Sequence, residues 1–86
     1  MKVEIRDGLE FEVNENAVGD WRVVELINDI EDGKVWKTVS LAKMILSPES
    51  YEKVKTINTD KNGHMNANNV EQMVTDIMLA VETTKK

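Results

Sequence analysis

Residues 1–13 alternate between apolar and polar side chains, with a turn signal in the middle. The apolar positions are Met1, Val3, Ile5, Leu9, Phe11 and Val13, and Asp7-Gly8 lies between the two halves. Alternation predicts two β-strands, and an Asp-Gly pair between them predicts a hairpin. The register of that hairpin decides which side chains share a face, because a slip of one residue moves a whole apolar set to the opposite face.

Two registers are open to this hairpin. A two-residue loop would pair Arg6 with Leu9 and put the apolar residues of the two strands on opposite faces. A three-residue loop over residues 6–8 puts all the apolar residues on one face, through the pairs Ile5–Leu9, Val3–Phe11 and Met1–Val13. We predict the second register, with Gly8 in the left-handed conformation. Because a two-stranded hairpin is marginal alone, the rest of the chain must cover its apolar face.

Helical spacing begins after a polar linker. Asp20 is a good N-cap for a helix that starts at Trp21, and Gly33 is a natural stop. The apolar positions of this helix are Val23, Val24, Leu26, Ile27 and Ile30. A second helix is predicted over residues 35–46, with an inner face of Val35, Trp36, Val39, Ala42, Ile45 and Leu46. We expect Trp21 and Trp36 to anchor the core rather than to stack on a ligand.

Two further helices are predicted. Ser47 as N-cap and Pro48 at the first helical position begin a short third helix, whose buried positions are Tyr51, Val54 and Ile57. The last helix connects Val70, Met73, Val74, Ile77 and Val81, with Met78 and Leu79 beside them. The predicted fold is therefore α+β, mainly α, with a β-hairpin (1–13) followed by about four short helices (20–82). We expect a single small domain over residues 1–82 and a frayed tail over residues 83–86.

The segment NTDKNGHMNANNVE, residues 58–71, looks like the start of an EF-hand calcium loop. Oxygen-bearing side chains alternate and a glycine is sixth: Asn58, Asp60, Asn62 and Gly63. However, position twelve needs a bidentate Glu and holds Asn69, and only Asp60 is charged. We therefore predict no calcium site, but a tight turn with Asn66 or Asn69 as the cap of the last helix.

Composition excludes several classes of function. The 86-residue chain has a formal net charge of −5, which is a poor match for nucleic acid. It has no cysteine for a disulfide or thiolate, and a single histidine, His64, predicts no transition-metal site. No apolar run reaches the roughly 20 residues of a membrane span, and the N-terminus lacks the apolar region of a signal peptide. We expect a cytoplasmic protein that binds neither nucleic acid nor membrane.

No catalytic constellation is evident in the sequence. Ser40, Ser47 and Ser50 have no evident base near them, and there is no glycine-rich phosphate loop. We therefore expect no enzyme activity, no catalytic residues and no cofactor.

Two sets of residues are candidates for binding a protein partner. Asp29, Glu31 and Asp32 crowd the end of the first predicted helix, where the helix dipole favours cations. They form either a solvated edge or a docking patch for a basic partner. Met73 and Met78 either fill gaps in the core or line an adaptable groove for a partner's apolar segment.

The order of these features resembles that of a known family. A strand pair is followed by an Asp-Trp helix start in GDWRVVELINDIEDG, then by the helical run LAKMILSPESYEKVK, and the polar turn TDKNGHMNANNV leads into the last helix. In this layout, residues 8–82 resemble the small tail assembly chaperones of long-tailed (siphovirus-type) phages and prophages of Gram-positive bacteria. The most recognisable signatures are Asp20-Trp21 and the turn at Gly63.

The resemblance implies a role without catalysis. Proteins of this family bind the long helical tape measure protein before the tail tube polymerises, and they help to recruit tail tube subunits. Many genomes make a second, longer form by ribosomal frameshifting. The implied partners are the tape measure protein, the tail tube protein and, as an open option, further copies of the chain. The main alternative is a small acidic regulatory adaptor, such as an anti-repressor or an antitoxin-like binding protein. A weak calcium-binding module ranks third.

Overall fold

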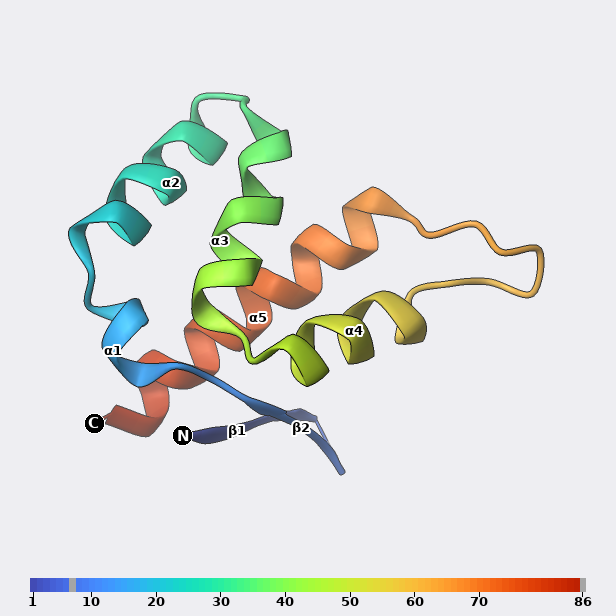
Figure 1. The fold of residues 1–86 in the computed structure, drawn as a ribbon, viewed down its shortest axis with the longest axis horizontal. Coiled ribbons are helices and arrows are strands. Elements are labelled where there is room, and N and C mark those ends of the chain that lie inside the picture. Colours follow the sequence, from blue (N-terminus) through green and yellow to red (C-terminus); the bar gives the residue numbers. More distant parts are fainter. Residues whose placement is uncertain (7, 86) are drawn as a thin grey trace.

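A computed structural model describes residues 1–6 and 8–85, and the side chains of residues 1–6 and 8–81. Two strands are followed by helices, in the order β1 (Lys2–Arg6), β2 (Leu9–Glu12), α1 (Glu15–Val18), α2 (Trp21–Glu31), η1 (Val35–Lys37), α3 (Thr38–Ile45), α4 (Pro48–Ile57) and α5 (Ala67–Lys85). The predicted class, α+β and mainly α with an N-terminal hairpin, is confirmed. Figure 1 shows α5 passing behind α3 and running to the hairpin. The last helix therefore lies beside the first strand, β1.

The open end of the hairpin has the predicted register. Val3 lies opposite Phe11, and both side chains are buried. Met1 and Val13 exchange backbone hydrogen bonds of 3.1 and 2.7 Å, which continues the ladder beyond the strands. The apolar face of the hairpin therefore begins at the first residue.

At the turn the register differs from the prediction. Arg6 lies opposite Leu9, and the ladder is irregular between Glu4 and Arg6. The predicted pair Ile5–Leu9 is therefore wrong. The additional residue on β1 takes up the slip, so Ile5 and Leu9 both still pack against the core. Gly8 has φ +74°, as predicted for a left-handed turn residue.

The predicted N-caps of three helices are confirmed by their hydrogen bonds. The Asp20 carboxylate accepts the Arg22 N–H at 2.8 Å at the start of α2. The Ser47 hydroxyl accepts the Ser50 N–H at 3.1 Å at the start of α4. The Asn66 side chain accepts the Asn69 N–H at 3.1 Å before α5, which decides between the two predicted caps. Local capping chemistry therefore fixes where these helices begin.

Two helix boundaries were not predicted. The short helix α1 occupies part of the expected linker, and the Asn14 side chain accepts the Ala17 N–H at 3.4 Å to cap it. At the other end, α5 continues to Lys85, beyond the expected limit of the helical part at residue 82. Fraying of the tail over residues 83–86 stays a prediction, and Lys86 lies outside the described residues. No glycine or proline interrupts the chain after Val81, so the helix has no local reason to stop there.

One hydrophobic core joins the hairpin to the helices. α5 packs against β1, α3 and α4, and α2 packs against α3. The buried residues are Val3, Phe11, Val13, Val23, Leu41, Ala42, Ile45, Leu46, Val54, Met73, Val74, Ile77 and Val81. The helices thus cover the one-sided hairpin, as its apolar face required.

The expected positions of both tryptophans are wrong. Trp21 is 71% exposed and Trp36 is 65% exposed. In α2 the inward face is the stripe of Val23, Leu26, Ile27 and Ile30, and Trp21 and Val24 lie outside it. Trp36 lies in η1, whose tighter 3₁₀ turn breaks the continuous helical face that was expected over residues 35–46.

Because of this 3₁₀ turn, the buried face over residues 35–46 differs from the predicted one. Val35 and Val39 are exposed, whereas Thr38 and Leu41 are buried. The predicted burial of Ala42, Ile45 and Leu46 is confirmed. Ile57, the last residue of α4, is also more exposed than expected.

Candidate functional site

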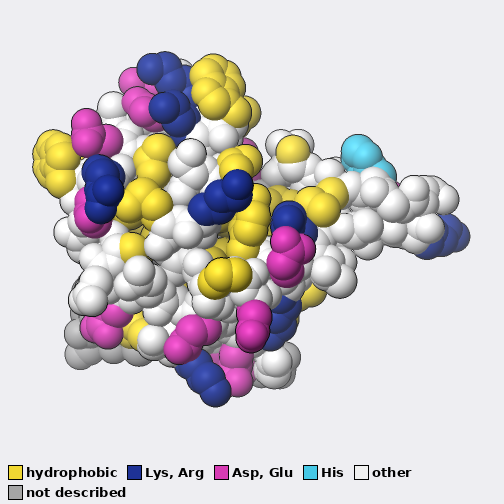
Figure 2. Space-filling model, in the orientation of Figure 1, with side chains coloured by type: hydrophobic (Ala, Val, Ile, Leu, Met, Phe, Trp, Pro, Cys, Tyr) yellow, Lys and Arg dark blue, Asp and Glu magenta, His cyan; other side chains and the backbone are white. Residues whose placement is uncertain are grey.

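Exposed apolar side chains gather around a hollow at η1 and the beginning of α5, which we call the Trp36 hollow. Its volume is about 330 Å³, and its lining comprises Val35, Trp36, Thr38, Val39, Ala42, Tyr51, Lys55, Met65, Ala67, Asn68, Val70 and Glu71. The side chains of Val35, Trp36, Val39 and Met65 are all exposed, Trp36 the most. Figure 2 shows several such hydrophobic side chains at the surface of the helical part, with charged side chains between them. Clustered exposure of this kind marks interaction surfaces, whereas single exposed apolar residues do not.

The turn between α4 and α5 holds Met65 at this hollow. Thr59 and Met65 form an isolated antiparallel bridge, and the Asn66 N–H donates to the Asn58 carbonyl at 3.3 Å. The Asp60 carboxylate accepts the N–H groups of Asn62 at 2.8 Å and His64 at 3.0 Å. The segment that resembled a calcium loop is therefore the predicted turn. The absence of calcium binding stays a prediction.

Lys55 and Glu71 are the charged residues in the lining of the Trp36 hollow. The Lys55 ammonium lies 2.7 Å from a Glu52 carboxylate oxygen and 4.6 Å from the centre of the Tyr51 ring. The hydrogen bond to Glu52 raises the pKa of Lys55 above its ordinary value. The cation is thus held by its own chain, and the hollow presents mainly apolar surface.

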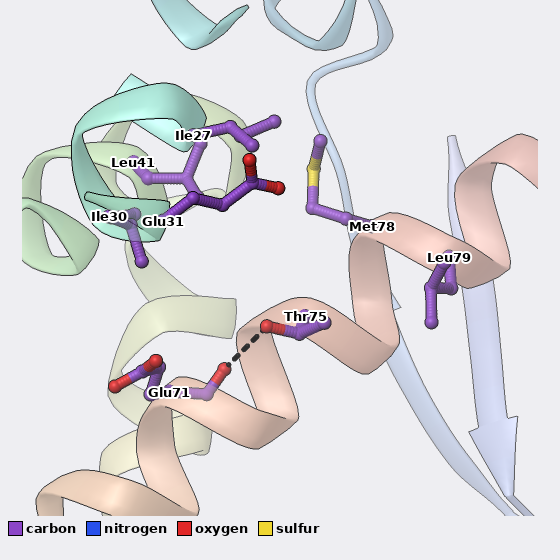
Figure 3. A pocket seen from close by; sticks show the side chains of 8 residues that line it. All are labelled: Ile27, Ile30, Glu31, Leu41, Glu71, Thr75, Met78 and Leu79. Atoms are coloured by element: carbon purple, nitrogen blue, oxygen red, sulfur yellow. Dashed lines mark hydrogen bonds between the residues drawn. The ribbon is translucent and has the colours of Figure 1, made fainter. Parts of the chain in front are cut away.

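A second hollow, which we call the Met78 groove, lies between α2, α3 and α5. Its volume is about 520 Å³, and its lining comprises Ile27, Ile30, Glu31, Leu41, Glu71, Thr75, Met78 and Leu79. In Figure 3, Met78 reaches from α5 toward Ile27 and Glu31 of α2, and the Thr75 hydroxyl donates to the Glu71 carbonyl at 3.0 Å. Glu71 borders both hollows.

The structure brings together two of the five predicted partner-binding residues. Glu31 and Met78 both line the Met78 groove. Asp29 lies 3.9 Å from the Lys34 ammonium and 4.0 Å from the Lys37 ammonium, so its charge is partly compensated within the chain. Asp32 is the exposed C-cap of α2.

The prediction that Met73 lines a groove is wrong. Met73 is only 4% exposed, and its sulfur accepts a hydrogen bond of 3.5 Å from the Asn58 side-chain amide. Three-residue steps from Val70 place Met73 on the buried stripe of α5, beside Val74 and Ile77. Of the two methionines, only Met78 therefore lies at a surface hollow.

Sequence reasoning missed the residues that stand out most, Trp21 and Trp36. Trp21 lies with Val24, Glu25, Asn28 and Asp29 around a third hollow of about 310 Å³. One signal could have found it: the steps from Val23 to Ile30 define the inward stripe of α2, and Trp21 and Val24 fall off that stripe. No comparable signal marks Trp36, because the switch from 3₁₀ to α geometry is not visible in the residue pattern.

The described residues contain no group of three or more His, Asp or Glu side chains that could hold a metal ion. Within the same part of the chain, every helix is too short or too polar to cross a lipid bilayer. Comparisons of the chain with protein-family models, with curated proteins and with solved structures found no match. The two apolar hollows and the layout of the sequence are therefore the features of the chain that bear on its function.

Proposed function

We propose that the protein is a tail assembly chaperone of a long-tailed phage or prophage, acting without catalysis in the cytoplasm of the bacterial host. In this role it binds the tape measure protein before the tail tube polymerises, and it helps to recruit tail tube subunits. The layout of residues 8–82 supports the proposal, as do the apolar side chains that the fold leaves open. An alternative role as a small acidic regulatory adaptor would need the same kind of surface but a compact partner.

The main structural support for this proposal is the exposed apolar surface of the Trp36 hollow. Trp36, Val39 and Met65 come from separate elements and are exposed around one concavity. Tryptophan is enriched among the residues that dominate binding energy at interfaces, because its large rigid ring loses little conformational freedom on binding. A long helical client presents apolar side chains at three- and four-residue steps, which can dock into such a hollow.

The direct test is co-expression with the tape measure protein. We expect the client to stay soluble only when the chain is present, and the two to co-purify. Trp36→Ala should lower the recovered client severalfold, whereas Trp21→Ala, at the other exposed tryptophan, is the matched control and should lower it less. Adding tail tube protein to the same pull-down tests recruitment, and light scattering of the purified chain tests self-association.

Three results would count against the chaperone. They are a client that is equally soluble alone, a client that does not co-purify, and recovery of a compact DNA-binding protein or toxin in its place. The last result would favour the regulatory adaptor.

A further inference from the structure

The Met78 groove has a chemistry different from that of the Trp36 hollow. Its apolar lining comes from Ile27 and Ile30 of α2, Leu41 of α3 and Met78 of α5, and Met78 reaches toward Ile27 in Figure 3. Among the described side chains, its charged residues are Glu31 and Glu71, and none of the lysines and arginines lines it. The groove is therefore a mainly apolar concavity, and the charged groups that line it are both carboxylates.

These carboxylates are open to a partner. Glu31 is exposed and Glu71 is half-buried, and neither has an ion-pair partner among the described side chains. Asp29, which lies in the same helix but lines the hollow around Trp21 instead, is already paired with Lys34 and Lys37. Glu31 and Glu71 therefore leave uncompensated negative charge in the lining of the groove.

The shape of the groove favours a helical partner. Its walls are three helices, whose backbone groups are already used in their own hydrogen bonds, so an extended segment would find no strand edge to pair with. A helix needs only side-chain contacts. The volume of about 520 Å³ falls within the range of roughly 300–1,000 Å³ that is usual for ligand sites.

We propose that the Met78 groove binds an amphipathic helical segment whose apolar anchor is flanked by lysine or arginine. This inference rests on the proposed function, under which the segment belongs to the tape measure protein. The anchor lies against Met78 and Ile27, and the flanking cations meet Glu31 and Glu71. Methionine suits such a site because its flexible, polarisable side chain adapts to different anchors.

The test uses the ¹⁵N-labelled full chain and two synthetic peptides of about 16 residues, near the length at which a helix is marginal in water. One peptide is an amphipathic helix of leucine and lysine, and the other replaces every lysine by glutamate. We expect the lysine peptide to shift the amide resonances of residues 27–31 and 71–79, and the glutamate peptide to shift none. A variant with Glu31→Gln and Glu71→Gln should raise Kd about two- to tenfold at low salt.

The control variant removes the same number of charges elsewhere, through Glu10→Gln and Glu49→Gln, which are both exposed. It should change Kd by less than twofold if the groove itself selects the cations. The proposal is overturned if the glutamate peptide binds as well, if the two double variants weaken binding equally, or if the shifts gather at the Trp36 hollow. It is also overturned if the groove resonances move when the protein alone is diluted, because the occupant would then be a second copy.

The experiments distinguish a failure of the proposed function from a failure of the inference about the Met78 groove. If the intact tape measure protein co-purifies with the chain but the lysine peptide does not bind in the groove, the proposed function stands and this inference falls. If the peptide binds as expected and no tape measure protein is captured, the groove stands and the chaperone role falls.

Discussion

Thr38 carries a buried hydroxyl group that has no hydrogen-bond partner among the described residues. Such a group costs about 1–3 kcal/mol of desolvation that nothing offsets. Thr38→Val keeps the shape and removes the hydroxyl, so we expect the free energy of unfolding in urea to rise by about 1 kcal/mol.

Ser50 is the matched control for this change, because its buried hydroxyl accepts the Glu12 N–H at 2.8 Å and ties α4 to β2. Ser50→Ala should lower the stability by about 1–3 kcal/mol, since it leaves that N–H unsatisfied. If both changes destabilise the protein alike, Thr38 has a partner such as an ordered water.

Trp21 should matter little for folding, although it follows a helix cap. Its side chain is 71% exposed, so Trp21→Ala removes few core contacts, and we expect the free energy of unfolding to change by about 0.5 kcal/mol or less. Phe11→Ala, at the fully buried aromatic residue of β2, should cost about 3–5 kcal/mol by comparison. Thermal melting of the two variants beside the wild type makes the comparison. If the Trp21→Ala protein unfolds, Trp21 contributes to the core after all and this prediction is wrong.

Asp20 links stability to pH at the start of α2. The side-chain hydrogen bonds from Arg22, with the Arg22 backbone N–H, lower the pKa of Asp20 from 3.8 to about 2. Because the pKa is lowered in the folded state, the stabilisation is present above pH 3.8 and is lost as the pH falls toward 2. Salt should weaken it, because the pair lies at the surface.

Asp20→Asn keeps a capping oxygen but does not titrate. The difference in Tm between wild type and this variant should be constant above pH 3.8 and should shrink between pH 3.8 and about 2. A difference that does not change across this range would show that Asp20 titrates normally.

At the scale of elements, α5 organises the fold, because it touches the hairpin at one end and α3 and α4 along its length. Two neighbouring positions test this. Ile77 is 0% exposed, and Leu79 is 58% exposed. Ile77→Ala should cost about 2–5 kcal/mol, because it opens a cavity where α5 meets the core.

Leu79→Ala removes a side chain of similar size from the same helix, and it should cost far less because most of its surface is already in water. Urea unfolding of both variants gives the two values. Similar losses would mean that helix propensity, rather than packing, sets the stability of α5.

The starts of the helices could be predicted because capping is local. Asp20, Ser47 and Asn66 each satisfy an N–H group two or three residues ahead, so a short stretch of sequence contains all the information. The face that a helix buries is decided by its neighbours. Trp36 lies in a 3₁₀ turn that its own sequence context does not reveal. Met73 falls on the apolar stripe of α5, but the stripe alone does not show that other elements cover this residue.

At the scale of the whole molecule, the candidate binding surfaces come from the packing of several elements. The Met78 groove forms only when α2, α3 and α5 are packed together. The sequence could therefore indicate Glu31 and Met78 as candidates, but it could not show that they line one groove. The same holds for the Trp36 hollow, where Met65 arrives from the turn after α4. Residues that lie more than 30 positions apart meet in both sites, and only long-range packing places them.

The net charge of −5 predicts how a client is captured. An acidic molecule attracts a basic segment over a distance, which raises the association rate, whereas apolar contacts made after docking control dissociation. Glu31→Lys and Asp32→Lys should therefore each lower kon for the tape measure protein by a few-fold at low salt. The effect should disappear as salt shortens the reach of the field to about 8–10 Å or less.

Trp36→Ala should act on the other rate constant. It removes exposed apolar area at the Trp36 hollow without changing charge, so koff should rise severalfold at every salt concentration while kon stays near the wild-type value. Kinetic binding measurements on immobilised client at low and high salt separate the two effects. A kon that is insensitive to salt would mean that charge does not control association. A Trp36→Ala variant that alters only kon would mean that the apolar contacts of Trp36 do not control dissociation.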